Sequence, residues 1–245
     1  MMYGPQRSDV QLRFEIPSEC AQIVGRGEST IGLVPVAEIS RQRMDVVPGY
    51  GIACHGAVRS ILLISRRPVR QIKTLATDSS SRTSVQLARV VLREVYGVKP
   101  EIVSRAPQLD SMLRECDAAL LIGDSALVLD PYKLPFEVLD LGAEWYALTG
   151  LPMVFALWAG RVSGRMEQLS SIVDGSCQFG CEHINDIVEL EHERRCVSRE
   201  LAYEYLTRYI HYQIGDTEWR GLEAFLELAG LEQPAAVLAQ AALLR

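Results

Sequence analysis

The chain has 245 residues, of which 48% are hydrophobic and 23% charged, and its formal net charge is −6. This composition is typical of a soluble globular protein, and the length allows one large domain or two smaller lobes. The acidic balance, without a basic stripe, argues against a nucleic-acid partner. No run approaches the roughly 18 apolar residues that span a membrane, and no secretion signal is recognised, so we expect a cytoplasmic protein.

The apolar runs in the first two thirds of the chain predict short strands. They cover residues 12–16, 30–34, 44–53, 60–65, 74–77, 101–104, 118–122, 136–141 and 153–158. Helices are predicted between many of them, among others over 82–96 and 108–116, and from Arg165 onward nearly everything has a helical pattern, ending with 217–229 and 234–244. This alternation predicts mainly parallel α/β sheets arranged in two lobes.

Six cysteines are scattered along the chain without the spacing of a disulfide framework, so we expect reduced thiols. The one spacing that suggests a metal site is Cys177-x-x-x-Cys181-x-His183. Structural zinc sites usually use tighter pairs on a turn, whereas this stretch has a helical pattern. The sequence therefore predicts no metal.

Hydroxyl side chains gather where the predicted strand 74–77 gives way to the predicted helix 82–96. Residues 79–84 contain five hydroxyls and Arg82. A helix N-terminus leaves backbone N–H groups without partners and carries partial positive charge, so hydroxyls placed there can help to hold a carboxylate or phosphate. A plain helix cap needs one hydroxyl. Five within six positions therefore favour an anion site over a simple cap.

Ligands of open α/β sheets bind beyond the carboxyl ends of the strands. This rule places Pro35 and Gly123, together with segment 78–84, on ligand-facing edges. Asp124 either projects its carboxylate into a cleft or caps the next turn, and both interpretations stay open. We expect Arg59 to be solvated. His55 is the first candidate for a general base, but we favour a structural role for it.

Three groups of segments, in chain order, resemble one known family. The first group is 16–21 (IPSECA) with 32–35 (GLVP), and the second is 58–63 (VRSILL) with 78–84 (DSSSRTS). The third is 120–124 (LLIGD) with 140–145 (DLGAEW) and 158–161 (WAGR). Together they resemble the chorismate dehydratases of the futalosine route to menaquinone, over nearly the whole chain from about Leu12.

The resemblance implies an α/β fold of the type II periplasmic-binding-protein kind, with two lobes and a helical C-terminal segment. Lobe 1 would comprise residues 1–66 and 152–245, and lobe 2 residues 67–151. It also implies a lyase that removes water from chorismate, a dicarboxylate, to give 3-[(1-carboxyvinyl)oxy]benzoate without a cofactor. By position, the predicted substrate-binding residues are Pro35, Ser60, Ser81, Arg82, Thr83, Ser84, Gly123 and Asp124.

Members of this family begin with a further strand that ends in a Tyr-Leu-Asn motif, whose Asn lies in the active site. That first strand is apparently missing here, so the catalytic residue stays unassigned. A start codon assigned too late or a real loss of the strand would each explain this.

Two other functions stay open, a solute-binding protein without catalysis and the related lyase that acts on a cyclic futalosine-derived intermediate. The expected partner is a small dicarboxylate, with no membrane or nucleic acid, and a homodimer is left open.

Overall fold

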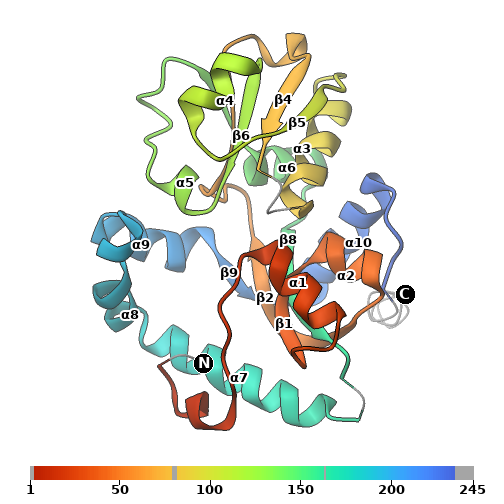
Figure 1. Cartoon of the computed structure of the whole chain (residues 1–245), viewed down its shortest axis with the longest axis vertical. Helices are drawn as coiled ribbons and strands as arrows, with labels where there is room; N and C mark the ends of the chain where they lie inside the picture. The colour runs from red at the N-terminus through yellow and green to blue at the C-terminus, as the bar shows by residue number, and fades with distance from the viewer. Residues whose placement is uncertain (1–2, 79–81, 163, 235–245) are drawn as a thin grey trace.

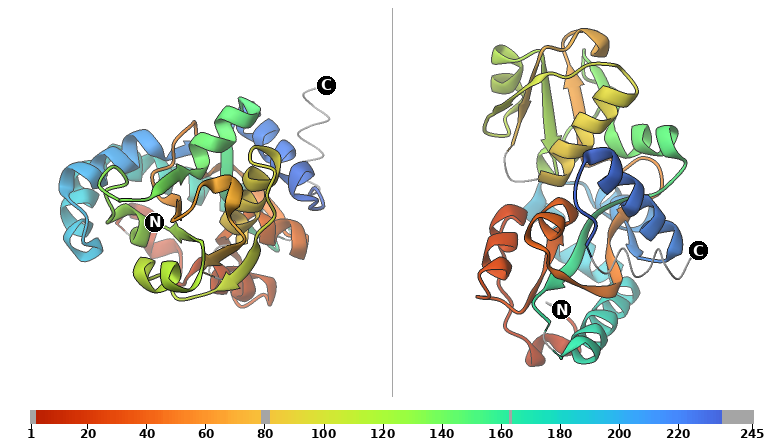
Figure 2. Two further views of the ribbon diagram at one scale, coloured as in Figure 1. Left: turned by 90° about the horizontal axis from the view of Figure 1, so that it is seen from above. Right: turned by 90° about the vertical axis from the view of Figure 1, so that its right-hand side faces the viewer.

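The computed structural model describes residues 3–78, 82–162 and 164–234. The predicted site residue Ser81 and most of the predicted helix 234–244 lie outside these residues. The described chain forms two sheets, one above the other in Figure 1 and in the side view of Figure 2. Sheet A, in the lower part, has the strand order β1 (Ile31–Pro35), β8 (Met153–Gly160), β2 (Asp45–Cys54), β9 (His211–Gln213). Sheet B, in the upper part, has the order β5 (Glu101–Ser104), β4 (Thr74–Thr77), β6 (Ala118–Ile122), β3 (Ile61–Ser65), β7 (Glu137–Asp140).

Sheet B is covered by helices on both faces, which explains the continuous apolar runs of its central strands β3 and β6. Alternate side chains of β3 enter two separate cores. Leu63 joins a core with Leu87 of helix α3 (Arg82–Glu94), whereas Leu62 joins one with Met112 of helix α4 (Leu109–Glu115). The period of two along each strand therefore divides the apolar residues between the two faces.

The prediction of mainly parallel sheets is wrong. In sheet B, β4 runs parallel to β5 and β6, whereas β3 is antiparallel to β6 and β7. In sheet A every pairing is antiparallel, because β8 returns from sheet B and inserts between β1 and β2. The sequence pattern shows which segments are strands, but the position of a returning strand depends on contacts far apart in the chain.

The predicted strand 12–16 does not form. This stretch is irregular, and Phe14 and Ile16 are 71% and 59% exposed. Among the described residues, β1 pairs with β8 and with no second strand, so the stretch has no neighbour to complete a ladder. An apolar alternation without a pairing partner does not make a strand.

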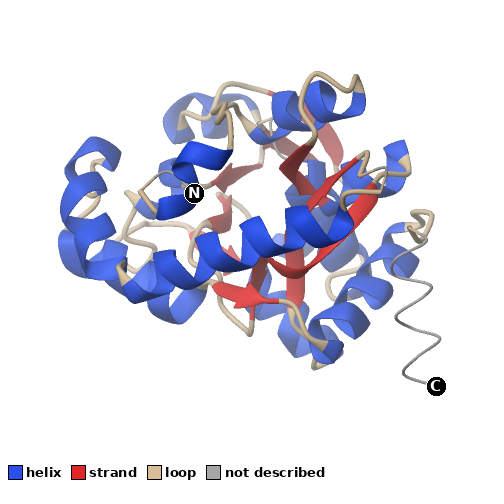
Figure 3. Cartoon of the chain, turned by 90° about the horizontal axis from the view of Figure 1, so that it is seen from below, coloured by secondary structure: helices blue, strands red, loops and turns tan. Residues whose placement is uncertain are grey.

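Helices complete the part of the molecule around sheet A. They are η1 (Pro5–Asp9), α1 (Pro17–Gly25), α2 (Val36–Gln42), α7 (Met166–Glu182), α8 (Ile184–Glu191), η3 (Glu193–Arg195), α9 (Arg199–Glu204), the π-helical turn η4 (Tyr205–Tyr209) and α10 (Asp216–Ala229). The remaining helices, η2 (Val69–Gln71), α5 (Asp124–Leu127) and α6 (Leu141–Thr149), accompany sheet B. Seen from below, the long helix α7 crosses the molecule beneath sheet A (Figure 3).

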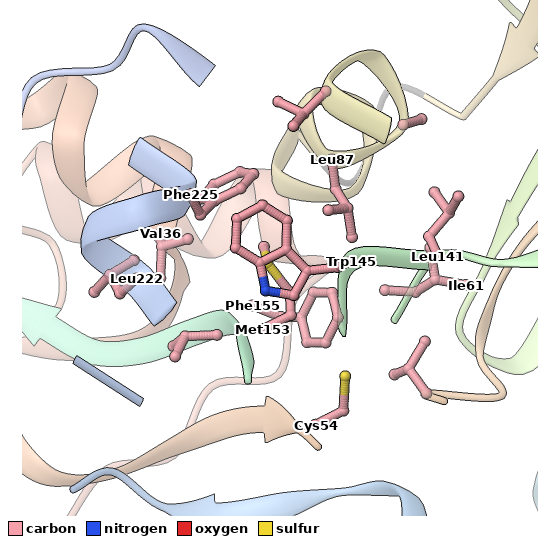
Figure 4. Close-up of a cluster of buried hydrophobic side chains, with 14 of the residues drawn as sticks. Val36, Cys54, Ile61, Leu87, Leu141, Trp145, Met153, Phe155, Leu222 and Phe225 are labelled. Atoms are coloured by element: carbon pink, nitrogen blue, oxygen red, sulfur yellow. The ribbon is translucent and has the colours of Figure 1, made fainter. Parts of the chain in front are cut away.

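One apolar core continues from sheet A into sheet B (Figure 4). At its centre Trp145 of α6 is fully buried and meets Phe225 of α10 edge to face, with ring centroids 6.0 Å apart. The indole N–H of Trp145 donates a hydrogen bond to the carbonyl oxygen of Pro152 at 3.1 Å. Because a Cβ on Gly221 would lie 2.1 Å from the same oxygen, α10 can pack here only with glycine at that position.

The chain crosses between the sheets twice, through residues 55–60 and through α6, and one carboxylate fixes both crossings. Asp140, at the end of β7, accepts hydrogen bonds from the backbone N–H groups of Val58 (3.0 Å), Arg59 (2.6 Å), Gly142 (2.9 Å) and Ala143 (3.1 Å). The last two bonds cap the N-terminus of α6, which is why the predicted strand 136–141 ends at Asp140.

Arg59 is not solvated as expected. Its φ of 66° is in the left-handed region, and its guanidinium donates to the carbonyl oxygens of Ala126, Leu127 and Leu129. These carbonyls belong to the last turn of α5 and to the turn that follows it. Arg59 thereby attaches the first crossing to sheet B.

The strand β3 pairs within sheet B, although the predicted boundary at residue 66 assigned it to the first lobe. A boundary near residue 60 agrees with this pairing. The division of the remaining residues into lobes stays a prediction.

We expect Asp140→Asn to destabilise the fold, because an amide offers one acceptor oxygen and turns an NH₂ group toward backbone N–H donors. The loss in free energy of unfolding should be about 1–3 kcal/mol, measured by urea denaturation. Asp130→Asn, at an exposed site paired with Lys133, is the control and should change this free energy little. Equal stabilities for the two variants would contradict the role assigned to Asp140.

Candidate functional site

The predicted site residues lie where one set of strand ends of sheet B faces sheet A. The parallel strands β4 and β6 end on this side of sheet B, and β3, which is antiparallel to β6, begins there. From sheet A, the end of β1 approaches the same region. We call this region the seam and define it as Pro35, Ala37, Glu38, Ser60, Arg82, Thr83, Ser84, Gly123 and Tyr205.

A hydrogen bond between two helix N-termini closes one end of the seam. Pro35 precedes α2 and provides no side-chain cap, so the backbone N–H of Ala37 needs an acceptor from elsewhere. Thr83, in the first turn of α3, provides it through Oγ1 at 3.2 Å. Thr83 is 1% exposed and Ser84 is similarly buried. Two of the predicted hydroxyls therefore lie at the contact between the two halves of the molecule.

Arg82 of α3 pairs with a buried carboxylate on α2. Its guanidinium lies 3.1 Å from Oε1 of Glu38, and Arg41 lies 2.7 Å from Oε2. Burial alone raises the pKa of Glu38, but the hydrogen bonds from Arg41 and Gln42 and the charge of Arg82 outweigh it and lower that pKa below its usual value. Arg82 and Arg41 share this one carboxylate, and whether Arg82 also binds a substrate stays a prediction.

A cavity of about 490 Å³ lies beside the seam, between α2, α3 and the end of α10. It is lined by Ala37, Glu38, Ser40, Arg41, Arg43, Arg82, Gln86, Gly230, Leu231 and Glu232. Of the eight predicted substrate-binding residues, Arg82 lines it. Arg41 and Arg82 share Glu38, and Arg43 is paired with Glu232, so three guanidinium groups face two carboxylates and the cavity wall carries one net positive charge.

The other end of the seam is built around Ser60. Its Oγ accepts a hydrogen bond from the hydroxyl of Tyr205 at 3.0 Å, and its carbonyl oxygen accepts one from the N–H of Gly123 at 2.8 Å. Burial raises the pKa of Tyr205, with a smaller opposing effect from Ser60, so the phenol stays protonated at neutral pH. This end therefore presents two neutral hydroxyls.

The structure brings together Pro35, Ser60, Arg82, Thr83, Ser84 and Gly123, but it turns Asp124 elsewhere. The carboxylate of Asp124 lies 3.0 Å from the guanidinium of Arg195, with both side chains more than half exposed. Such an exposed pair stabilises little. Asp124 is the first residue of helix α5, and the N-cap position belongs to Gly123, so Asp124 does not cap this helix either.

Tyr205 was missed by the sequence analysis. It lies in a helical stretch 145 residues from Ser60, and no local pattern links the two positions.

Nearby, burial raises the pKa of the Cys54 thiol to about 12. A neutral buried thiol is a poor nucleophile, so Cys54 is not suited to covalent catalysis. The seam thus provides hydroxyl and N–H groups that can bind and orient an anion.

A family model described as menaquinone biosynthesis matches residues 1–230. The chain belongs to this family. A protein of Thermus thermophilus named chorismate dehydratase is 28% identical over 234 residues, which cover 88% of this chain and 85% of that protein. The resemblance seen in the sequence is thereby confirmed at the level of the family.

Solved structures show the same fold at low sequence identity. A protein from Archaeoglobus fulgidus is similar with a TM-score of 0.68 and 18% identity, covering 88% of this chain and 84% of its own. The alkanesulfonate-binding protein from Xanthomonas axonopodis pv. citri follows with 0.64 and 12%, covering 94% and 86%. The periplasmic aliphatic sulphonate-binding protein from Escherichia coli has 0.58 and 13%, covering 93% and 79%. The predicted two-lobed periplasmic-binding-protein-like fold is therefore confirmed.

Among the described residues, no helix is both long and apolar enough to cross a bilayer.

The ion pairs of Glu38 should make the seam sensitive to acid. Because the pKa of Glu38 is lowered on folding, its stabilisation is present above the unfolded pKa near 4.5 and is lost as pH falls through the folded pKa. We expect Glu38→Gln to lower the free energy of unfolding by about 1–3 kcal/mol at neutral pH, and the difference from wild type to shrink at about pH 3.

The measurement is urea denaturation at both pH values, with Glu19→Gln as the control. Glu19 is part-exposed and lies 3.5 Å from Arg26, so its removal should matter little at either pH. A difference between wild type and Glu38→Gln that grows toward acid would contradict this account.

Proposed function

We propose that the protein is a chorismate dehydratase, which removes water from chorismate to give 3-[(1-carboxyvinyl)oxy]benzoate. The observation that carries the proposal is the relationship to a protein named chorismate dehydratase over 88% of this chain. That stretch is long enough to include both sides of the seam. The family description, menaquinone biosynthesis, supports the same assignment.

The proposed reaction requires the protein mainly to orient the substrate and to stabilise the departing hydroxyl. A proton leaves the ring carbon that bears the enolpyruvyl ether, the neighbouring hydroxyl departs, and the ring becomes aromatic. Aromatisation supplies much of the driving force, so the site must mainly orient the groups and assist the departing hydroxyl. Hydrogen-bond donors suffice for this role. The proton acceptor is a protein base or the substrate's own carboxylate, and both stay open.

Chorismate has two carboxylates, and the contact between α2 and α3 suits one of them. The N–H of Ala37 and the hydroxyl of Thr83 now bond to each other. A carboxylate placed between them would accept hydrogen bonds from both groups, with further donors from Ser84 and the helix N-termini. Substrate would thus replace a direct contact between the two halves of the molecule, which requires the seam to open for entry.

Ser60, directly before β3 of sheet B, and Tyr205, in the helical turn η4, would face the ring side of the substrate, near Pro35. The Tyr205 hydroxyl is neutral and already directed at Ser60, so the pair can donate a hydrogen bond to a departing hydroxyl group. Gly123 holds this end in place through its bond to the Ser60 carbonyl.

A second candidate, binding without catalysis, is favoured by the structural similarity to the two sulfonate-binding proteins. Incubation with chorismate separates the candidates. A dehydratase should yield a product lighter by one water, detected by liquid chromatography and mass spectrometry. Chorismate that binds and is recovered unchanged would contradict the proposal and favour a binding protein. Conversion of the cyclic futalosine-derived intermediate, with chorismate untouched, would favour the related lyase.

Removal of the Thr83 hydroxyl should weaken substrate binding. We expect Thr83→Val to lower kcat/KM by about 10- to 100-fold, because a hydrogen bond to a charged group is lost. Thr83→Ser keeps the hydroxyl and should stay within a few-fold of wild type. Circular dichroism of both variants would verify that they fold. Equal activity of the valine and serine variants would exclude Thr83 from the site.

A further inference from the structure

Outside the seam, three side chains that commonly bind metals converge at one end of sheet A. His55 follows β2, His211 begins β9, and Glu218 lies in the first turn of α10. One ligand atom from each lies within 4.8 Å of the others, the one such group found among the described residues. The pairing of Ala53 with His211 brings the two histidines side by side, although they are far apart in the sequence.

Glu218 is held in position before any ligand is considered. Its side chain is 7% exposed, and Oε2 accepts a hydrogen bond from the backbone N–H of Gly215 at 2.9 Å. The second oxygen, Oε1, is thereby turned toward the histidines, 2.7 Å from Nε2 of His55 and 3.8 Å from Nε2 of His211. A second partner that fixes a carboxylate in this way is a regular feature of metal sites.

Two imidazole rings lie near the same carboxylate oxygen, although one would be enough to form a hydrogen bond with it. His55 alone reaches Oε1 at hydrogen-bond distance, yet the ring of His211 also lies close, with centroids 4.5 Å apart and planes at 61°. Ligand atoms of a tetrahedral zinc site are about 3.3 Å apart. The two observed separations from Oε1 bracket this value, and all three ligand atoms lie within 4.8 Å of one another, so the side chains would rotate to admit an ion.

We propose that His55, His211 and Glu218 form a binding site for a divalent transition-metal ion such as Zn²⁺. Two imidazole nitrogens and one carboxylate oxygen are a ligand set that zinc accepts, with a further position for water. Both histidine side chains are nearly half exposed, which leaves an entry path for the ion and its water. A bound ion would link two neighbouring strands of sheet A, β2 and β9, to the helix α10.

The thiols Cys177 and Cys181 on α7 are the competing metal ligands. Burial and the neighbouring Cys181 raise the pKa of Cys177 to about 12. Because a metal-binding thiol must lose its proton, this pair is the weaker candidate. Cobalt distinguishes the two sites, since thiolate ligands produce a strong charge-transfer band in the near ultraviolet and imidazole and carboxylate ligands do not.

The test is titration of the chelator-treated, reduced full chain with Co²⁺, followed by absorption, and with Zn²⁺, followed by calorimetry. We expect one ion per chain, visible cobalt bands without a thiolate band, and binding at least about 100-fold weaker in His55→Ala and His211→Ala. His183→Ala and Cys177→Ser are the controls and should bind like wild type. His183 is a suitable control because its ring stacks on Phe179, away from Glu218.

A thermal readout complements the titration. Zn²⁺ should raise the Tm of wild type and of His183→Ala but not that of His211→Ala, because an ion that binds only the native state stabilises it. The proposal would be overturned by an absence of zinc binding, by unchanged affinity in the His55 and His211 variants, or by loss of binding in Cys177→Ser.

Discussion

The hydrogen bonds accepted by Asp140 are the constraint on which the rest of the structure depends. Both crossings between the sheets end on this one carboxylate, which receives backbone N–H groups from residues 58–59 and from the first turn of α6. Ser60 follows directly, so its position relative to Gly123 is set by the same carboxylate. The guanidinium of Arg59 adds a second attachment at the end of α5. These polar contacts hold both crossings at one end of sheet B and, together with the apolar core, set the position of the seam.

The two halves of the molecule are joined by apolar contacts on one side of the crossings and by polar contacts on the other. A continuous apolar core, with Trp145 and Phe225 at its centre, joins the two halves through α6 and α10. Across the seam the contacts are polar, through the bond between Thr83 and Ala37 and the ion pair between Arg82 and Glu38. Apolar packing favours one fixed arrangement, whereas a hydrogen bond between two helix N-termini can be exchanged for bonds to an anion. This difference makes the seam the side on which a ligand would enter.

Much of the fold could be predicted from the sequence, because the strongest signals are local. The runs that form β3 and β6 are apolar except for Ser65, since both faces of sheet B are covered, and the periodicity of α3 was clear. The hydroxyls at the start of α3 also pointed to the seam, where Thr83 and Ser84 lie. Pairing was not predictable, because the insertion of β8 between β1 and β2 depends on the return of the chain from sheet B.

The incorrect element predictions and the missed contacts have one physical cause, namely interactions between segments that are far apart in the sequence or compete for the same residue. The stretch 12–16 has the alternation of a strand but no partner, and Asp140 ends β7 because it caps α6. Tyr205 reaches Ser60, and Glu38 binds Arg82, through contacts that no spacing in the sequence reveals. The convergence of His55, His211 and Glu218 is of the same kind. Sequence patterns thus identified most of the elements and several residues of the seam, whereas the partners of individual polar groups required the structure.

A crystal structure of the protein with chorismate, or with an unreactive dicarboxylate of the same shape, tests the central claim most directly. The account predicts a carboxylate oxygen within about 2.7–3.2 Å of both the Thr83 hydroxyl and the Ala37 N–H, with their direct bond broken. A ligand seated in the cavity beside Arg43 and Gly230, with the bond between Thr83 and Ala37 intact, would contradict it.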